Sequence, residues 1–430
     1  MVSMFPDLAE LWKIPEYRKL IWARFISNYG NGLRPIALAF GVLGLQGANA
    51  SSLSIVMAAA MAPIVILLIP GGVLADRYPR ALIVGLSDVV LSGLVIFNGF
   101  AFLKGWATVP LLCLIAVLSG SLNALWWPAF GGLMPEVVPK DKLQSANSIN
   151  AFGSNVSNIA GTVTGGIVVA GVGAGWALII DGVTFLIAGI LVFQLRGVGS
   201  SREKTEHSPT VFDDIKEGWS EFRSHSWVVA TVAAYSVAVM LSESLFAVVG
   251  PYHAKTELGG PKPWSYILAA LSAGMICGVL VSMRYKPKRP LVVSLLSQVS
   301  TGTLMLSVGL SHSIVLIMAI AFVAGMSMDF FFIMWNTALQ THIPSESISR
   351  VTSYDAFGSL FFTPLGLIIA GPITSKLGSA HTLQLFGVLW ILIVLSPLLV
   401  RGVRDLSGQP PANVVENEDT VLPSDSGKTL

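Results

Sequence analysis

The sequence has few charged residues and almost no cysteine. Asp, Glu, Lys and Arg make up 12% of its 430 residues, about half of the share in soluble globular domains. The two cysteines, Cys113 and Cys277, lie far apart in apolar stretches, which argues against a disulfide framework. The net charge is only +2, and no basic run resembles a nucleic-acid patch. We therefore expect neither a soluble or secreted domain nor a nucleic-acid partner.

Motifs of enzyme chemistry are also lacking. The chain has no G-x-x-x-x-G-K-[ST] loop for nucleotide phosphates, no H-E-x-x-H, and no Cys/His cluster with metal-ligand spacing. We predict that the protein is not an enzyme and that it holds no metal and no cofactor. Without a nucleotide site, any pumping must draw on an ion gradient or a substrate gradient.

Hydrophobic residues, by contrast, make up 53% of the chain and gather in long runs. A run of about 20 apolar residues can cross a lipid bilayer as a helix. We predict an all-α membrane protein with twelve transmembrane helices, at about 20–45, 51–75, 81–103, 109–133, 145–172, 176–195, 227–252, 264–283, 291–310, 313–340, 351–375 and 382–400.

The 26 Lys and Arg residues are divided unequally between the two sides of these helices. With both termini in the cytoplasm, 21 fall on cytoplasmic segments, four on outer connections and one, Arg34, within a span. The positive-inside rule therefore predicts a multi-pass protein of the cell inner membrane whose termini are both cytoplasmic.

The chain also repeats itself. The tetrapeptide Ala151–Ser154 recurs as Ala356–Ser359, 205 positions later, and other matching glycines follow at the same offset. We therefore divide the chain into an N-terminal six-helix bundle (1–196), a cytoplasmic linker with an amphipathic helix (197–226), a C-terminal six-helix bundle (227–403) and a disordered tail (404–430).

The connection between the second and third spans carries a charged motif. It reads G-x-L-A-D-R-x-x-R from Gly72 to Arg80, and it closely resembles a signature of the major facilitator superfamily. The resemblance implies a monomeric secondary transporter whose two pseudo-symmetric bundles surround a central cavity. It also implies that Asp76 latches the inner gate against the start of the eleventh helix. Arg77 and Arg80 are expected to hold the loop at the membrane surface and to pair with Asp88.

Three charges fall near the middle of predicted spans, where each is costly. Arg34, Glu243 and Asp329 lie on helices 1, 7 and 10, which the resemblance implies are cavity-lining helices. Arg34 can balance only one of the two acids, so we expect the other to bind and release a proton. The alternative is that Arg34 forms a buried structural pair. Asp181, on helix 6, is expected to be a structural or interfacial group.

Other residues of the predicted substrate and proton path are polar or aromatic. Asn123 on helix 4 lies 206 positions before Asp329, close to its repeat mate. Aromatic side chains follow it and recur on helix 10, either as a substrate-lining surface or as ordinary packing. They are Trp126, Trp127 and Phe130, and then Phe331, Phe332 and Trp335.

A glycine motif lies on the fifth span. Gly161, Gly165 and Gly166 have the spacing that allows close helix contact. The segment also resembles an antiporter signature of the superfamily, with Thr162 in the place where proline is usual.

Three further segments narrow the resemblance to one branch of the superfamily. Asn28–Gly32, Trp176–Asp181 and Glu217–Phe222 are similar to the macrolide-efflux and siderophore-export branch, the transmembrane secretion effector family. Its members commonly have Asp where this chain has Asn31. We therefore predict proton-coupled efflux of a hydrophobic small molecule, such as a drug, macrolide, siderophore or secondary metabolite. The alternatives are an importer or symporter of a small metabolite and a non-transporting membrane sensor.

Overall fold

The computed structural model describes residues 10–139, 142–195, 219–343 and 348–407, apart from the side chains of 68–77 and a few others within helices. The side chains of Gly72, Asp76 and Arg77 therefore lie outside the description. Most of the predicted tail (404–430) and most of the predicted linker lie outside it as well. The regular secondary structure of the described residues consists of helices, and these residues contain no β-strand.

The N-terminal half contains six long helices. They are α2 (Pro15–Gly44), α3 (Ala50–Arg77), α4 (Arg80–Leu103), α5 (Val109–Gly131), α7 (Leu143–Val172) and α8 (Ala174–Phe193), with the short α6 (Met134–Val137) between α5 and α7. Eleven helices of the described chain are long and apolar enough to span a membrane. The twelfth is α2, whose 30 residues include the polar Asn28, Asn31 and Arg34.

The C-terminal half also contains six spans, but three of them are interrupted. The seventh is α10 (Ser226–Ser244), a π-helical turn (Leu245–Val249) and α11 (Gly250–Thr256); the ninth is α13 (Pro290–Ser297) and α14 (Val299–Leu310); the eleventh is α16 (Ile348–Phe361) and α17 (Thr363–Leu377). The others are α12 (Pro261–Arg284), α15 (Ile314–His342) and α18 (Ser379–Leu395), and α19 (Arg401–Arg404) follows a 3₁₀ turn at Ser396–Leu399.

Two of the interruptions have visible causes. The backbone carbonyl of Gln298 accepts a 2.8 Å hydrogen bond from Trp390 Nε1, and its side chain donates to the Ser327 carbonyl at 2.8 Å. Gln298 is thus bonded to neighbouring helices at the point where α13 ends. Between α16 and α17, Pro364 lacks the N–H that a continuous helix needs.

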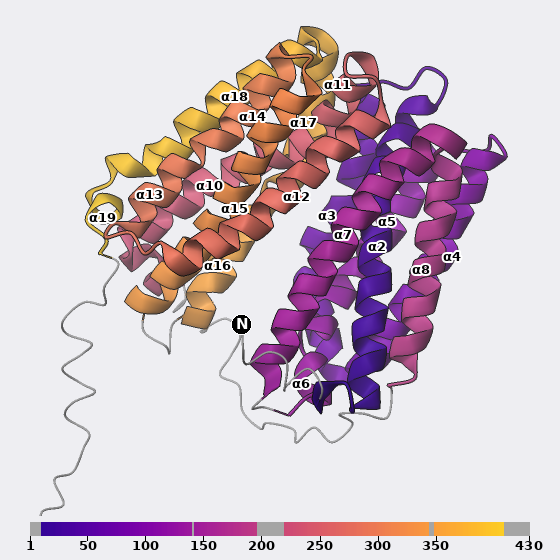
Figure 1. The fold of residues 1–430 in the computed structure, drawn as a ribbon, viewed down its shortest axis with the longest axis horizontal. Coiled ribbons are helices and arrows are strands. Elements are labelled where there is room, and N and C mark those ends of the chain that lie inside the picture. The colour runs from indigo at the N-terminus through magenta and orange to yellow at the C-terminus, as the bar shows by residue number, and fades with distance from the viewer. Residues whose placement is uncertain (1–9, 140–141, 196–218, 344–347, 408–430) are drawn as a thin grey trace, which may run out of the picture.

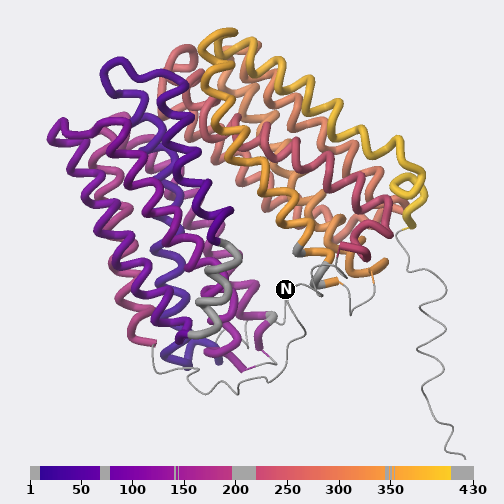
Figure 2. The backbone as a smooth tube through the Cα atoms, turned by 180° about the vertical axis from the view of Figure 1, so that it is seen from behind, coloured from indigo at the N-terminus to yellow at the C-terminus, as the bar shows by residue number. Residues whose placement is uncertain are grey.

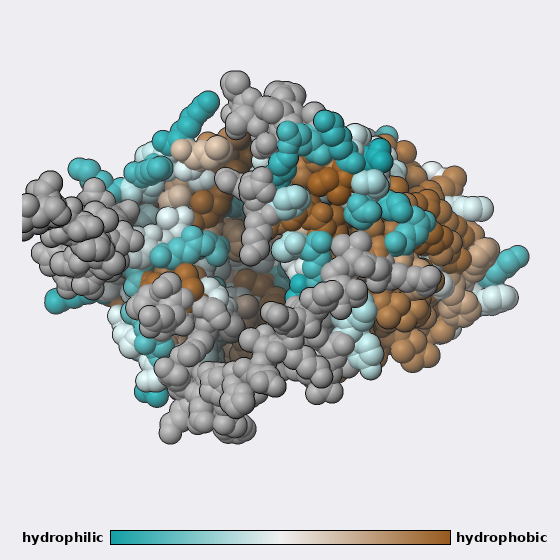
Figure 3. Space-filling model, turned by 90° about the horizontal axis from the view of Figure 1, so that it is seen from below, coloured by the Kyte–Doolittle hydropathy of each residue, from teal (hydrophilic) through white to brown (hydrophobic). Residues whose placement is uncertain are grey.

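The two halves form a V (Figures 1 and 2). They meet at the end that carries the short connections around 45–49, 257–260 and 378, which we call the closed end. They diverge toward the opposite end, which carries the connections around 78–79 and 285–289 and which we call the open end. Seen from the open end, the surface is hollowed between the halves, hydrophilic residues lie around the hollow, and a broad hydrophobic flank lies outside (Figure 3).

The repeat is visible at single residues of the structure. Gly173 joins α7 to α8 with φ +92° and ψ 166°, and Gly378 joins α17 to α18 with φ +81° and ψ 155°. Both one-residue connections need the positive φ that glycine adopts without strain. Gly173 and Gly378 are 205 positions apart, so the two halves turn in the same way at the same place.

Candidate functional site

The halves touch at the closed end through small residues. A Cβ on Gly166 of α7 would collide with Ser265 and Pro261 of α12, and a Cβ on Gly371 of α17 would collide with Ser51 and Ser54 of α3. Gly166 and Gly371 are repeat mates, so a matching pair of glycine contacts closes this end.

Hydroxyl groups add hydrogen bonds beside these glycines. The amide of Gly371 donates to Ser54 Oγ at 3.1 Å, Ser54 Oγ bonds the carbonyl of Leu367, and the Ser51 and Ser375 hydroxyls are 3.3 Å apart. The Lys255 ammonium also reaches across, to the carbonyl of Leu43.

The other two motif glycines act within the N-terminal half. Added Cβ atoms on Gly161 and Gly165 would collide with or crowd the backbone of α2 at Tyr29 and Leu33. Gly366, the repeat mate of Gly161, approaches the backbone of α10 at Met240 in the same way. The glycines of this motif therefore allow neighbouring helices to approach closely, which is the first of the two interpretations given above.

The charge in the first span is paired inside the N-terminal half. Arg34 Nε donates to Asp181 Oδ2 of α8 at 2.7 Å, and its guanidinium lies 4.4 Å from the centre of the Phe185 ring. The Asp181 side chain is 0% exposed. The prediction that Arg34 balances Glu243 or Asp329 is therefore wrong. The alternative, a buried pair, is what the structure contains, with Asp181 as its acid.

A second set of charges lies nearer the open end of the same half. The Arg24 guanidinium lies 4.1 Å from the centre of the Phe130 ring and 5.1 Å from that of Trp126, and these two rings stack 4.7 Å apart. Asp88 is 3% exposed, and its Oδ1 has no hydrogen-bond partner among the described residues.

Arg24 is a residue that the sequence analysis missed. The charge count of the sequence analysis assigns Arg24 to the cytoplasmic segment at the start of the chain and leaves Arg34 as the one cation within a span. In the structure it lies nine residues inside α2 and faces aromatic rings. Cation–π contact with Trp and Phe stabilises a guanidinium in such a place.

Arg80, the last residue of the charged motif, has different partners from those predicted. Arg80 Nη1 donates to the Gly132 carbonyl at 2.8 Å and lies 3.2 Å from Glu136 Oε1. Asp88 forms no ion pair with any residue that the structure describes, so the expected pairing of Arg80 with Asp88 is wrong. The cause is geometric: eight residues along α4 separate Arg80 from Asp88, which places Asp88 inside the bundle.

A cavity of about 100 Å³ lies between the helices of the N-terminal half. Its polar lining is Arg34, Asn98, Ser119 and Asn123, and the rest is mainly aliphatic. Asn123 donates to the Ser119 carbonyl at 3.0 Å, whereas Arg34 Nη2 and Asn98 Oδ1 have no hydrogen-bond partner among the described residues. Asn31 is half-buried on α2.

The acids of the C-terminal half differ from those of the N-terminal half. Neither Glu243 nor Asp329 makes a hydrogen bond or an ion pair with any residue that the structure describes. Glu243 lies two residues before the π-helical turn Leu245–Val249. Such turns occur frequently at functional sites. The sequence therefore places these two acids in spans, and the structure leaves both without a cation.

The predicted aromatic residues divide into packed and exposed ones. Trp335 is 5% exposed, and its Nε1 donates to Asp355 Oδ2 at 2.8 Å, so it is a packing residue here. Trp126 is half-buried against Phe130. Trp127 and Phe332, by contrast, are 64% and 63% exposed. They are repeat mates on α5 and α15, 205 positions apart.

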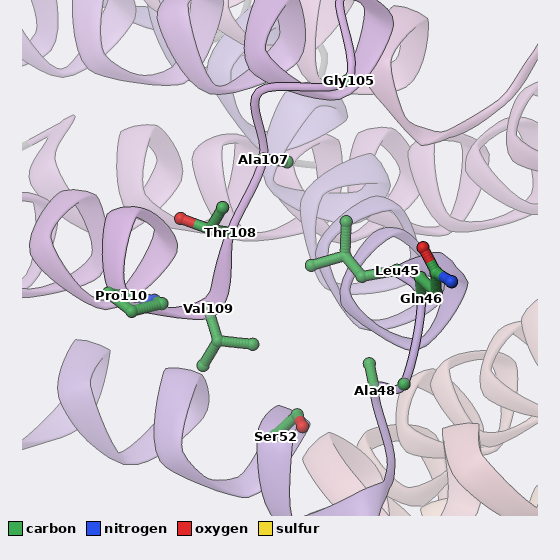
Figure 4. Close-up of a pocket in the computed structure, with 10 residues that line it drawn as sticks. Leu45, Gln46, Ala48, Ser52, Gly105, Ala107, Thr108, Val109 and Pro110 are labelled. Carbon is green, nitrogen blue, oxygen red and sulfur yellow. The ribbon is translucent and has the colours of Figure 1, made fainter.

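Another cavity, of about 480 Å³, lies at the closed end within the N-terminal half (Figure 4). It is lined by the α2–α3 and α4–α5 connections, and the side chains of Leu45 and Val109 point into it. No charged residue is among its lining residues. The described residues also contain no group of three or more His, Cys, Asp or Glu placed to hold a metal ion.

The arrangement of two bundles is shared with known transporters. The nucleoside transporter NupG matches with a TM-score of 0.70 at 12% identity, covering 89% of this chain and 98% of that one. A bacterial homologue of the iron transporter ferroportin, in an inward-facing state, matches with a TM-score of 0.68 at 14% identity, covering 88% and 98%. At these identities the likeness concerns the fold.

Sequence comparison gives the family. The Multidrug efflux pump Tap of Mycolicibacterium fortuitum is 26% identical over 412 residues, which cover 90% of this chain and 96% of that protein. The family model described as Major Facilitator Superfamily matches residues 20–360. The chain therefore belongs to the Major Facilitator Superfamily.

Proposed function

We propose that this membrane transporter exports a hydrophobic small molecule in exchange for protons. The observation that carries the proposal is the state of the two acids in the C-terminal half. Arg34 is already neutralised by Asp181, so both Glu243 and Asp329, and not one of them, are left without a cation. Both side chains are half-buried within membrane-spanning helices, where a carboxyl without a cation is favoured in its protonated form. Both acids are therefore candidates for the proton carrier.

The exposed aromatics support an apolar substrate. Trp127 and Phe332 present large rings on α5 and α15, and Phe152 and Phe357, another pair of repeat mates, are 64% and 49% exposed on α7 and α16. Rings of this kind bind flat apolar molecules and, through their faces, cations. The relative Tap, a multidrug efflux pump, supports export of such compounds.

The two ends of the molecule suit alternating access. In the proposed orientation the open end, which is rich in Lys and Arg, faces the cytoplasm. Asp76 then latches this end when it closes, while the glycine contacts of Gly166 and Gly371 part. The Asp76→Asn variant should lose transport and keep its fold. Reporter fusions at Gly47 and Gly173 should report the outside, and a fusion at Pro79 should report the cytoplasm.

Proteoliposomes with an imposed proton gradient test the proposal. Glu243→Gln or Asp329→Asn should abolish uphill export of a hydrophobic cationic dye, and one of the two should keep gradient-independent exchange. Asp405→Asn, an exposed acid beyond α19, is the matched control and should pump like the parent.

The same assay separates the alternatives. If both amides pump at the parental rate, neither acid carries the proton. Accumulation in the direction opposite to the proposed export identifies an importer. Saturable binding of compounds without any flux identifies a sensor.

A further inference from the structure

A cationic connection lies at the open end of the C-terminal half. Arg284, the last residue of α12, and three cations of the connection to α13, Lys286, Lys288 and Arg289, lie within six positions, and all four are exposed. None of them forms an ion pair with a residue that the structure describes. The sequence has no acidic residue between Glu257 and Asp329. The positive charge of this connection is therefore not balanced locally.

The repeat makes this imbalance specific to one half. The connection is the counterpart of the charged motif between the second and third spans, where the acid Asp76 precedes the basic residues Arg77 and Arg80. In the C-terminal half, Ser282 stands at the position that corresponds to Asp76, 206 residues later. The C-terminal connection therefore has basic residues like those of the charged motif but no residue like Asp76.

An apolar groove of about 250 Å³ begins directly at these cations. Its walls are α12 and α13, which both pack against α15. The lining residues are Val281, Tyr285, Val293, Ser297, Val323, Met326, Ser327 and Phe330. Tyr285 belongs both to the lining and to the cationic run, so the groove and the charges are continuous.

The groove offers almost no hydrogen bond to a ligand. The hydroxyls of Ser297 and Ser327 donate to the carbonyls of Ser294 and Ala324, at 2.7 and 2.8 Å. The remaining lining residues are apolar apart from Tyr285, whose ring stacks on Phe330 with centres 6.2 Å apart. An aromatic pair at the end of a span is typical of the level of the lipid headgroups.

The groove also faces the hydrocarbon region. Met283 and Leu296 beside it are 70% and 50% exposed, and Val323 in its lining is 45% exposed. Large apolar side chains that are exposed on a transmembrane helix contact acyl chains. A ligand of this groove therefore arrives from the membrane.

We propose that this groove and connection form a binding site for an anionic phospholipid. One acyl chain lies in the groove between α12 and α13, and the phosphate lies among Lys286, Lys288 and Arg289. Basic clusters at the cytoplasmic ends of transmembrane helices bind such headgroups. A zwitterionic lipid adds a cation of its own to a site that already has four, so the site selects net negative headgroups. The proposal does not depend on the direction of transport.

Native mass spectrometry of the full-length transporter tests the site. The protein is stripped of lipid and mixed with phosphatidylglycerol and phosphatidylcholine that have the same acyl chains. The parent should retain phosphatidylglycerol preferentially. Lys286→Gln/Lys288→Gln should lower the affinity for phosphatidylglycerol about 30-fold, since each basic residue near an anionic headgroup contributes about fivefold. The Lys286→Arg/Lys288→Arg variant is the matched control and should bind like the parent.

The groove is tested separately from the charge. Val323→Trp should fill it and reduce phosphatidylglycerol retention while all four cations remain, and Val293→Trp serves if that variant is not monodisperse. The control Val315→Trp places the same ring on an exposed position of α15 near the closed end. Equal retention of the two lipids by the parent, or parental retention by Lys286→Gln/Lys288→Gln, would overturn the proposal. Displacement of the lipid by inorganic phosphate alone would show a simple phosphate site instead.

Discussion

The two halves share one arrangement of helices, but different side chains cover the same aromatic pair in each half. On α5 and α15 the matching pairs Trp126–Phe130 and Phe331–Trp335 both stack, with centres 4.7 and 6.3 Å apart. In the N-terminal half the guanidinium of Arg24 covers this pair. In the C-terminal half the ring of Tyr235 covers it instead, stacked on Phe331 at 4.1 Å.

The same contrast holds for the charges within the spans. In the N-terminal half Arg34 pairs with Asp181, whereas Glu243 and Asp329 have no cation in the described structure. We infer that the charges of the N-terminal half stay the same during transport. In the C-terminal half, a carboxyl group binds and releases the proton. The two halves thus share the arrangement of their helices, whereas the charged side chains on those helices differ.

The largest expected effect is in the N-terminal half. Arg34→Met should lower the free energy of unfolding by about 3–5 kcal/mol, because it leaves the Asp181 carboxylate buried without its cation. The measurement is thermal or denaturant unfolding of the purified protein. The double variant Arg34→Met/Asp181→Leu is the control and should recover most of the loss. If the double variant is no more stable than the single one, the pair does not explain the cost.

The glycine contacts should respond alike in both halves, because there the halves are the same. Gly166→Ala or Gly371→Ala should weaken the closed end by about 1–3 kcal/mol, the usual cost of overpacking. The readout is the yield of a disulfide between Ser51→Cys and Ser375→Cys, whose native hydroxyls are 3.3 Å apart, in a variant without Cys113 and Cys277.

The control for the glycine contacts is Gly171→Ala. An added Cβ on Gly171 has no atom within 4 Å apart from its own helix and chain neighbours. This variant should cross-link like the parent. An effect of Gly371→Ala without one of Gly166→Ala would show that the two contacts are not equivalent.

A smaller effect is expected for the tryptophan of the C-terminal aromatic pair. Trp335→Phe keeps the stack on Phe331 and loses the hydrogen bond to Asp355, so it should cost about 1 kcal/mol of unfolding free energy. Trp127→Phe, at an exposed position, should change stability much less but should alter the selectivity of export. Equal stability losses for the two variants would contradict the division into packed and exposed aromatics.

The smallest change in stability is expected for the two acids that the transport proposal uses. Glu243→Gln and Asp329→Asn remove no partner, so the free energy of unfolding should change by less than about 0.5 kcal/mol. The same unfolding measurement as for Arg34 checks this. A loss of several kcal/mol at either position would place that acid in a structural network like that of Asp181.

The fold was predictable because it depends on properties of the sequence alone. Twelve apolar runs and the 205-residue repeat specify the spans and their pairing. The interruption at Gln298 was not predictable, since it depends on the indole of Trp390, 92 positions away. The polarity of α2 shows the limit of hydropathy, because Asn31 and Arg34 lower its mean value although it spans the bundle.

The partner of Arg34 could have been found by counting from the correct end. Arg34 lies ten residues before the closed end of α2 at Gly44, and Asp181 lies seven residues after the start of α8 at Ala174. Both residues are therefore at nearly the same depth. Counting Arg34 from the open end hid this agreement and suggested the acids of the other half instead. The exposed cations at 284–289 were visible in the sequence, but the groove beside them needs the packing of three helices.

The closed-end contacts have one more consequence. The described hydrogen bonds that hold the halves together there join hydroxyls, amides and carbonyls, and the one cation among them, Lys255, binds a backbone carbonyl. None of them joins opposite charges, so dissolved ions do not screen this seal. Ionic strength should therefore act on the conformational equilibrium almost entirely through the opposite, Lys- and Arg-rich end. A transporter built in this way has one gate that responds to the salt of its surroundings and one that does not.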